Sequence, residues 1–175
     1  MIGIREAEII VKKRFGIDLS DTGSTHLPVL VSVLSRTDGD VLELGTGKFS
    51  TPVLHEFCEI MGRRLFSYES NKEYYDKVKS FQTKLHSIEY VENFSQASIE
   101  QDWSLVFIDH RPADRRVVDI KRVSGYADYI VCHDTEPESD YIYGYSGTFK
   151  NFPYRWDYTK FKTHTTVIST KREWK

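Results

Sequence analysis

Short apolar runs alternate with stretches of helical hydrophobic spacing through the middle of this chain. Apolar residues recurring every three or four positions predict helices that begin at Thr51, Asn71 and Arg111. The apolar runs are too short for buried helices, and polar turns bound them, so each predicts a buried strand. Regular alternation of strands and helices is typical of right-handed crossovers and a mainly parallel sheet. The five predicted strands are 41–44, 65–68, 88–91, 104–108 and 128–132.

The pattern differs at the two ends of the chain. Residues 3–15 predict an N-terminal helix, and Ser24 is expected to cap a second helix that carries Leu27, Leu30, Val31 and Leu34. After the fifth strand comes a tyrosine-rich and glycine-rich stretch, and then two strands at 154–158 and 165–169 that predict a hairpin. The expected fold class is α/β: a Rossmann-like three-layer sandwich with a mostly parallel seven-stranded sheet and a C-terminal antiparallel hairpin. We expect a single domain over residues 1–175. Its parts are the N-terminal helices (1–37), a cofactor-binding core (40–134), a lid (135–150) and a closing hairpin (151–175).

Composition narrows the class of protein. The chain has 175 residues, 39% of them hydrophobic and 14% aromatic, so it is expected to be globular. Its net charge of −2 makes a nucleic-acid partner unlikely, and no apolar run is long enough for a membrane span. Cys58 and Cys132 lie in apolar patterns and are expected to be buried thiols in a reducing compartment. With no signal-peptide form at Met1, the expected location is the cytoplasm, with a homodimer left as an option.

A glycine turn follows the first predicted strand. Gly45 and Gly47 interrupt the chain, and Thr51-Pro52 then opens a helix with a hydroxyl N-cap and proline at its first position. This arrangement directs unpaired backbone N–H groups and the positive end of a helix dipole at one place. A nucleotide-like cofactor is the expected ligand.

Four of the five predicted parallel strands end on polar residues or glycines. Because ligands bind beyond the carboxyl ends of such strands, we expect these positions to meet at one site. A carboxylate at the end of the second strand, Glu69, can accept hydrogen bonds from both hydroxyls of a ribose. The four strand ends are Gly45/Gly47, Glu69, Asp109-His110 and His133-Asp134.

Together these positions resemble class I S-adenosylmethionine-dependent methyltransferases. The run Glu43-Leu-Gly45-Thr-Gly47 is similar to the acidic-x-Gly-x-Gly motif of that superfamily, with the acid two residues before the first glycine. A Rossmann dinucleotide fingerprint would need a third glycine where Ser50 stands, which disfavours an oxidoreductase.

Within the superfamily the chain looks most like small-molecule O-methyltransferases of the catechol and macrocin types. The pair Ser95-Gln96 resembles their adenine-contacting Ser-Gln, and Asp109-His110 and His133-Asp134 resemble their fourth-strand and fifth-strand ends. The resemblance implies cofactor contacts by Glu43, Gly45, Thr46, Gly47, Ser50, Glu69, Ser70, Ser95, Gln96, Asp109 and His110. It implies catalytic roles for Asp109, His110, His133 and Asp134, and a divalent metal on Asp109 and Asp134.

The chain departs from that pattern in two places. Catechol-type enzymes have Asp-Asn, and macrocin-like enzymes Glu-Asp, where this chain has His133-Asp134. Imidazole suits Mg²⁺ poorly, so the alternatives are a softer ion, a site of Asp109 and Asp134 alone, or no metal. The lysine expected after Asp-His is replaced by Arg111, which stays protonated, so His110 or His133 is the candidate base.

The sequence therefore predicts S-adenosylmethionine-dependent methyl transfer to a hydroxyl of a small molecule, with metal assistance left open. Two alternatives remain: a metal-independent class I methyltransferase acting on protein, nucleic acid or an amine, and a non-catalytic cofactor-binding module or partner subunit. The run Asp21-Thr-Gly-Ser24 matches an aspartic-protease signature, but it does not follow an apolar strand and is interpreted as a turn. His26 is expected to face solvent or lie near the cofactor mouth.

Overall fold

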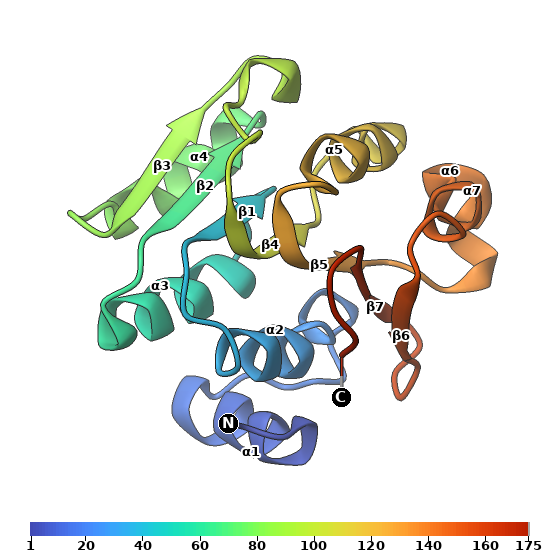
Figure 1. Cartoon of the computed structure of the whole chain (residues 1–175). Helices are drawn as coiled ribbons and strands as arrows, with labels where there is room; N and C mark the ends of the chain where they lie inside the picture. The colour runs from blue at the N-terminus through green and yellow to red at the C-terminus, as the bar shows by residue number, and fades with distance from the viewer. Residues whose placement is uncertain (175) are drawn as a thin grey trace.

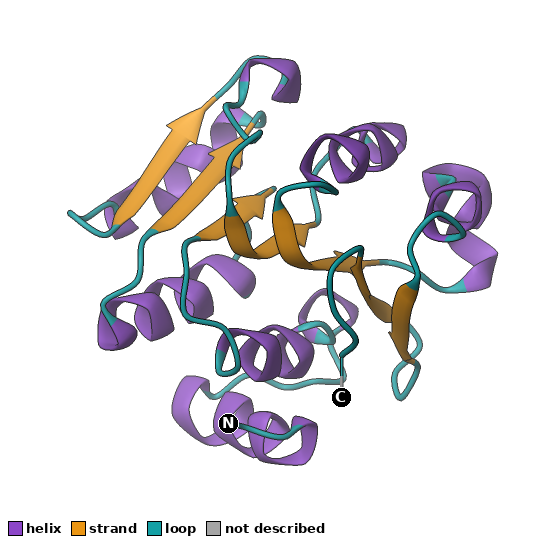
Figure 2. Ribbon diagram, viewed as in Figure 1, coloured by secondary structure: helices purple, strands orange, loops and turns teal. Residues whose placement is uncertain are grey.

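The chain forms one seven-stranded sheet with helices on both faces (Figures 1 and 2). The computed structural model describes residues 1–174. The strand order is β3-β2-β1-β4-β5-β7-β6; β1 to β5 are parallel, and β7 runs antiparallel to both β5 and β6. The predicted fold class is confirmed. The strands are β1 Val41–Leu44, β2 Leu65–Glu69, β3 His86–Tyr90, β4 Trp103–Ile108, β5 Ala127–His133, β6 Tyr154–Tyr158 and β7 Thr165–Ser169.

Two groups of helices cover the sheet. Helices α1 to α3 lie over one face, and α5, α6 and α7 lie over the other (Figure 1). The α-helices are α1 Ile4–Phe15, α2 Leu27–Leu34, α3 Ser50–Met61, α4 Lys72–Val78, α5 Arg116–Val123, α6 Asp140–Tyr143 and α7 Tyr145–Phe149. The short 3₁₀ helices are η1 Thr22–Ser24, η2 Lys79–Phe81, η3 Phe94–Gln96, η4 Ala113–Arg115 and η5 Pro137–Ser139.

The central strands bury side chains on both faces. In β4, Leu105 and Phe107 belong to the core under α2, whereas Val106 and Ile108 belong to the core under α5. Successive side chains of a strand point to opposite faces, which is why a doubly covered strand is apolar throughout. Past the strand, Asp109 contacts His133 of β5 and Arg116 of α5, whereas His110 contacts Asp119 of α5.

Two predicted helix caps are wrong, because the hydroxyls bind elsewhere. Helix α3 begins at Ser50, so Thr51 lies inside its first turn, where Thr51 Oγ1 accepts a hydrogen bond from the Gly47 N–H at 3.0 Å. Ser24 donates to the carbonyl oxygens of Asp18 and Asp21, both at 2.8 Å, and ends the 3₁₀ turn before α2. The turn interpreted from Asp21 to Ser24 is confirmed, because the Asp21 carboxylate accepts the Gly23 N–H at 2.9 Å.

The helix expected to reach Leu85 is shorter. Helix α4 ends at Val78 and η2 continues to Phe81; Thr83 Oγ1 then accepts the N–H groups of Leu85 and His86 ahead of β3. The segment predicted as a lid, 135–150, contains α6 and α7, and two of its tyrosines, Tyr143 and Tyr145, are buried and stacked at 5.2 Å.

Candidate active site

One cavity of about 790 Å³ opens at the carboxyl ends of the parallel strands. Its size suits a ligand as large as a nucleoside cofactor. Seven of the predicted cofactor contacts line it, and His133, Asp134, His26 and Arg116 also contribute to its wall. Those seven are Gly45, Thr46, Gly47, Ser50, Glu69, Asp109 and His110.

Gly45, the first glycine of the turn, has no room for a side chain because the backbone after β4 lies against it. Gly45 has φ +89°, and a Cβ there would lie 2.6 Å from His110 Cα and 2.7 Å from the Asp109 carbonyl carbon. These are backbone atoms, so a side chain at this position has no way to displace them cheaply. The β1 turn and the β4 end are therefore in direct contact.

The Glu69 carboxylate joins two loops of the cavity wall. Its Oε2 accepts from the Thr46 N–H at 2.7 Å and from Thr46 Oγ1 at 2.9 Å. Its Oε1 accepts from the N–H groups of Ser70 and Asn71, at 2.9 and 2.7 Å. Glu69 thus fixes the glycine turn relative to the start of α4.

Glu43 lies beneath the cavity rather than in its wall, contrary to the position expected for it near the methionine part of a cofactor. Its side chain is fully buried, and its carboxylate accepts from Ser67 Oγ at 2.6 Å and from Thr51 Oγ1 at 3.1 Å. Burial raises the pKa of Glu43 to about 7, against the opposing effect of these hydroxyls. Behind it, Ser67 Oγ is 2.9 Å from Nε2 of the buried His86.

Besides Glu43, three further predicted cofactor contacts do not line the cavity. Ser95 and Gln96 are exposed on η3, where Gln96 Oε1 accepts the Glu92 N–H at 3.1 Å and stabilises its own loop. Ser70 also lies outside the wall, although its backbone N–H binds Glu69.

A buried arginine organises the other end of the cavity. The Arg116 guanidinium donates to Asp109 Oδ1 at 2.9 Å and to Asp134 Oδ2 at 3.1 Å. It also donates to the His110 and His133 carbonyl oxygens, at 2.8 and 3.2 Å. Although burial opposes its charge, the two aspartates raise the pKa of Arg116, so it is a permanent cation.

Arg116 changes the interpretation of the predicted metal pair. The guanidinium bridges Asp109 Oδ1 and Asp134 Oδ2, so a metal ion shared by this pair would have only Asp109 Oδ2 and Asp134 Oδ1, the two oxygens that face His133. The predicted metal pair therefore stays a prediction, with one oxygen of each carboxylate already engaged. Sequence reasoning missed Arg116 because an arginine in the first turn of a helix is ordinarily solvated.

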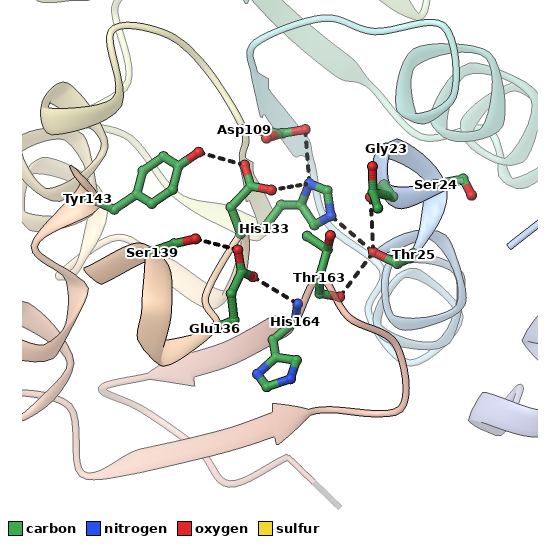
Figure 3. A network of polar contacts seen from close by, with 12 residues as sticks. Gly23, Ser24, Thr25, Asp109, His133, Glu136, Ser139, Tyr143, Thr163 and His164 are labelled. Atoms are coloured by element: carbon green, nitrogen blue, oxygen red, sulfur yellow. Dashed lines mark hydrogen bonds and ion pairs between the residues drawn. The ribbon is translucent and has the colours of Figure 1, made fainter. Parts of the chain in front are cut away.

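His133 lies between a hydroxyl and two carboxylates (Figure 3). Its Nε2 is 3.1 Å from Thr25 Oγ1, and its Nδ1 is 3.4 Å from Asp109 Oδ2 and 3.6 Å from Asp134 Oδ1. Burial disfavours its charged form, but the carboxylates of Asp109 and Asp134 prevail and raise the pKa of His133. Despite its burial, the pKa of Asp109 is lowered by His133 and Arg116.

The other predicted histidine points away from this cluster. His110 Nε2 is 3.0 Å from Asp119 Oδ2 of α5, and its ring packs on Phe94 at 4.2 Å. Burial lowers the pKa of His110, although Asp119 opposes the effect. His110 thus pairs with Asp119 of α5, whereas Asp109 pairs with Arg116 of the same helix and with His133.

His26 is buried instead of facing solvent, and it lies at the cavity wall as the other expectation placed it. Its ring packs 4.7 Å from Phe107 and 4.5 Å from His133, measured between ring centroids. Burial holds the pKa of His26 well below its ordinary value, so the ring is neutral.

Comparisons with known proteins bear on the fold. No protein-family model and no curated protein sequence matches this chain. Among residues 1–174, no helix has both the length and the apolarity needed to cross a bilayer.

Solved methyltransferase structures share the architecture. A delta-N METTL16 MTase domain is 12% identical, with a TM-score of 0.61 over 94% of this chain and 93% of that one. A human methyltransferase 10 domain containing protein is 10% identical, with a TM-score of 0.59 over 94% of each chain. A methyltransferase from Pyrococcus furiosus is 12% identical, with a TM-score of 0.59 over 97% and 96%. At these identities the likeness concerns the fold alone: the chain has the fold of class I S-adenosylmethionine-dependent methyltransferases, and these structures do not support the small-molecule O-methyltransferase subtype.

Proposed function

We propose that this protein binds S-adenosylmethionine and transfers its methyl group to a hydroxyl of a small molecule. The observation that carries the proposal is the position of Glu69, in the cavity wall beside the glycine turn, at the end of β2. A carboxylate there is placed for ribose hydroxyls, while the backbone around Gly47 borders the space for the amino-acid part of the cofactor.

Ribose binding at Glu69 requires one existing bond to change. The two carboxylate oxygens already accept four hydrogen bonds, which fills their usual capacity. Three of these donors are backbone N–H groups, and the fourth is the Thr46 hydroxyl, which a side-chain rotation releases. We propose that a ribose hydroxyl takes the place of the Thr46 hydroxyl.

The opposite end of the cavity supports a protic acceptor. Asp134 Oδ2 is held by Arg116 and Tyr143, whereas its Oδ1 has the longer 3.6 Å contact to His133. The backbone of Asp134 has φ +57°, a conformation that costs free energy in a residue other than glycine and is found at functional sites. In this proposal the cofactor supplies an electrophilic methyl group, Asp109 and His133 align the hydroxyl, and Asp134 Oδ1 accepts its proton.

Calorimetric titration of the purified chain with S-adenosylmethionine and S-adenosylhomocysteine tests the cofactor assignment. We expect micromolar binding of both, none of NAD, and at least tenfold weaker binding to Glu69→Ala, because a charge-assisted hydrogen bond is removed. Thr46→Val is the matched control, and it should bind as well as the native protein or better. Failure of both sulfur compounds to bind would refute the proposal.

Turnover assays separate the remaining alternatives. Methyl transfer to a panel of phenols and monosaccharides supports the small-molecule acceptor, whereas transfer only to RNA or protein would replace it. Cofactor binding with no transfer to any of these acceptors would favour a binding module or partner subunit.

A further inference from the structure

Three potential metal ligands from three different elements meet at the end of the cavity lined by Arg116, His133 and Asp134, hereafter the acceptor end. His26 precedes α2, Asp109 follows β4, and His133 ends β5. One ligand atom from each lies within 4.8 Å of the other two. Among residues 1–174, this is the single group of three or more such side chains close enough to share an ion.

His26 has no hydrogen-bond partner in this site. Both of its ring nitrogens are buried and unpartnered, and its side chain is 1% exposed at the cavity wall. Its packing contacts, the rings of Phe107 and His133, satisfy neither nitrogen. A buried polar group is ordinarily paired, so this imidazole points to a missing ligand.

His133 also presents a ring nitrogen to the same space, because Thr25 fixes the orientation of its ring. Thr25 Oγ1 is 3.1 Å from the Thr163 carbonyl oxygen and 3.3 Å from that of Thr22, so its single proton goes to a carbonyl. Its oxygen then accepts from His133 Nε2–H at 3.1 Å (Figure 3). Nδ1 then faces the carboxylates of Asp109 and Asp134, where it carries either a proton or, in the neutral ring, a lone pair that a metal ion can accept. A second group that orients a ligating histidine in this way is a regular feature of metal sites.

We infer that His26, Asp109 and His133 form a binding site for a divalent first-row transition-metal ion that opens into the cavity. Two imidazoles and one carboxylate suit Zn²⁺, Fe²⁺ or Co²⁺ and disfavour Mg²⁺ and Ca²⁺, which prefer oxygen ligands. The site differs from the pair predicted from sequence, because Arg116 occupies Asp109 Oδ1 and leaves Oδ2 facing His133. With both imidazoles neutral, Asp109, Asp134 and Arg116 sum to a single negative charge, which favours a dication.

The inferred ion also supplies what the proposed methyl transfer lacks, and in this respect it rests on the proposed function. An aspartate is too weak a base to deprotonate an ordinary alcohol near neutral pH. A metal ion held by His26, Asp109 and His133 would lower the pKa of a hydroxyl bound to it, and Asp134 would then be an adequate acceptor for the proton.

Metal binding to the purified full-length chain, stripped with a chelator and dialysed, tests the inference. We expect calorimetry with Zn²⁺ to show one tight equivalent. His26→Phe, which preserves an aromatic ring against Phe107, should weaken binding at least tenfold. His164→Asn is the matched control, since the His164 ring points away from the cluster (Figure 3), and its affinity should be unchanged. No binding to the native chain, or native affinity in a folded His26→Phe protein, overturns the site.

A second measurement does not depend on a variant. The Co²⁺-loaded native protein should show two paramagnetically shifted, exchangeable imidazole N–H signals, one for each coordinated histidine. Fewer than two would exclude His26 as a ligand together with His133. Cofactor titrations are run separately, so metal binding without S-adenosylmethionine binding would refute the proposed function and leave the metal site intact.

Discussion

The two ends of the cavity are built by different means. At the cofactor end, one continuous segment from β1 to α3 supplies the loop, and Glu69 of β2 fixes it through hydrogen bonds. At the acceptor end, side chains converge from four places far apart in the chain: the turn before α2, the ends of β4 and β5, and α5. Backbone geometry dominates the first end, and buried charge dominates the second.

Because of this difference, we expect substitutions at the two ends to act in different ways. At the cofactor end they act through the space around the backbone, and at the acceptor end through the balance of charge. The conformation of the glycine turn depends on having no side chain at Gly45, where the backbone after β1 meets that after β4. The acceptor cluster depends on one buried cation, Arg116, balancing two aspartates whose side chains are about three-quarters buried. The following predictions test this contrast.

The largest effect is expected from Arg116→Met. It leaves Asp109 and Asp134 without their shared cation, and removal of one partner from a buried ion pair costs about 3–5 kcal/mol. Urea unfolding measures the loss. Arg155→Met is the control, because its pair with Asp157 is exposed and its loss should cost less than about 1 kcal/mol. A loss for Arg116→Met as small as that of the control would show that the cluster does not depend on charge balance.

Gly45→Ala should destabilise the chain by about 3 kcal/mol or more, through the positive φ and the contact with the His110 backbone. Gly47→Ala is the matched control. Its added Cβ would meet only Ser50 Oγ at 3.5 Å, so the change in unfolding free energy should stay within about 1 kcal/mol. Equal effects of the two substitutions would mean that β1 and β4 do not touch as described.

Glu43→Gln should change how stability depends on pH. In the folded chain Glu43 keeps its proton to a pKa of about 7, whereas the unfolded chain releases it near its ordinary pKa of 4.5. Between these values the native state binds more protons, so the Glu43 contribution to stability is lost as pH rises from 4.5 to 7. The shift corresponds to about 3 kcal/mol at most.

The measurement is the difference in unfolding free energy between Glu43→Gln and the native chain at pH 4.5 and pH 7.5. Buried histidines such as His86 titrate in both proteins, so their contributions largely cancel. The variant should gain relative stability at the higher pH. A difference that is independent of pH would place the Glu43 pKa near its ordinary value.

Tyr143→Phe is expected to give the smallest effect, about 1 kcal/mol, because it removes one hydrogen bond to Asp134 while Arg116 remains. Thermal unfolding compares it with Tyr141→Phe, whose side chain is 87% exposed and whose hydroxyl should be dispensable. Indistinguishable melting temperatures would indicate that the Tyr143 hydroxyl does not hold Asp134.

Local pattern predicted the cofactor end better than the acceptor end. Strand–turn–helix order and the carboxylate at Glu69 are visible within a few dozen residues, and the terminal strands at 154–158 and 165–169 match β6 and β7 residue for residue. Arg116 could not be identified this way, since its burial depends on β4, β5 and α7 packing around it. His26 carries no sequence signal of burial beyond the helix that follows it, in which every residue but Ser32 is apolar.

Motif matching located Glu43 and His110 only in part. A motif match depends on residue type and ignores what each side chain packs against in the folded chain. His110 lines the cavity as predicted, but its Nε2 faces Asp119. Glu43 is fully buried and accepts hydrogen bonds from Ser67 and Thr51. These partners belong to α5, β2 and α3, so the strand ends alone do not reveal them.

The close approach of Gly45 to the backbone of Asp109 and His110 has a mechanical consequence. The two halves of the cavity share a single wall at this contact, with no compressible side chain between them. A displacement of the glycine loop toward β4 would therefore press on the Asp109 carbonyl and the His110 Cα, with no side chain between them to absorb it.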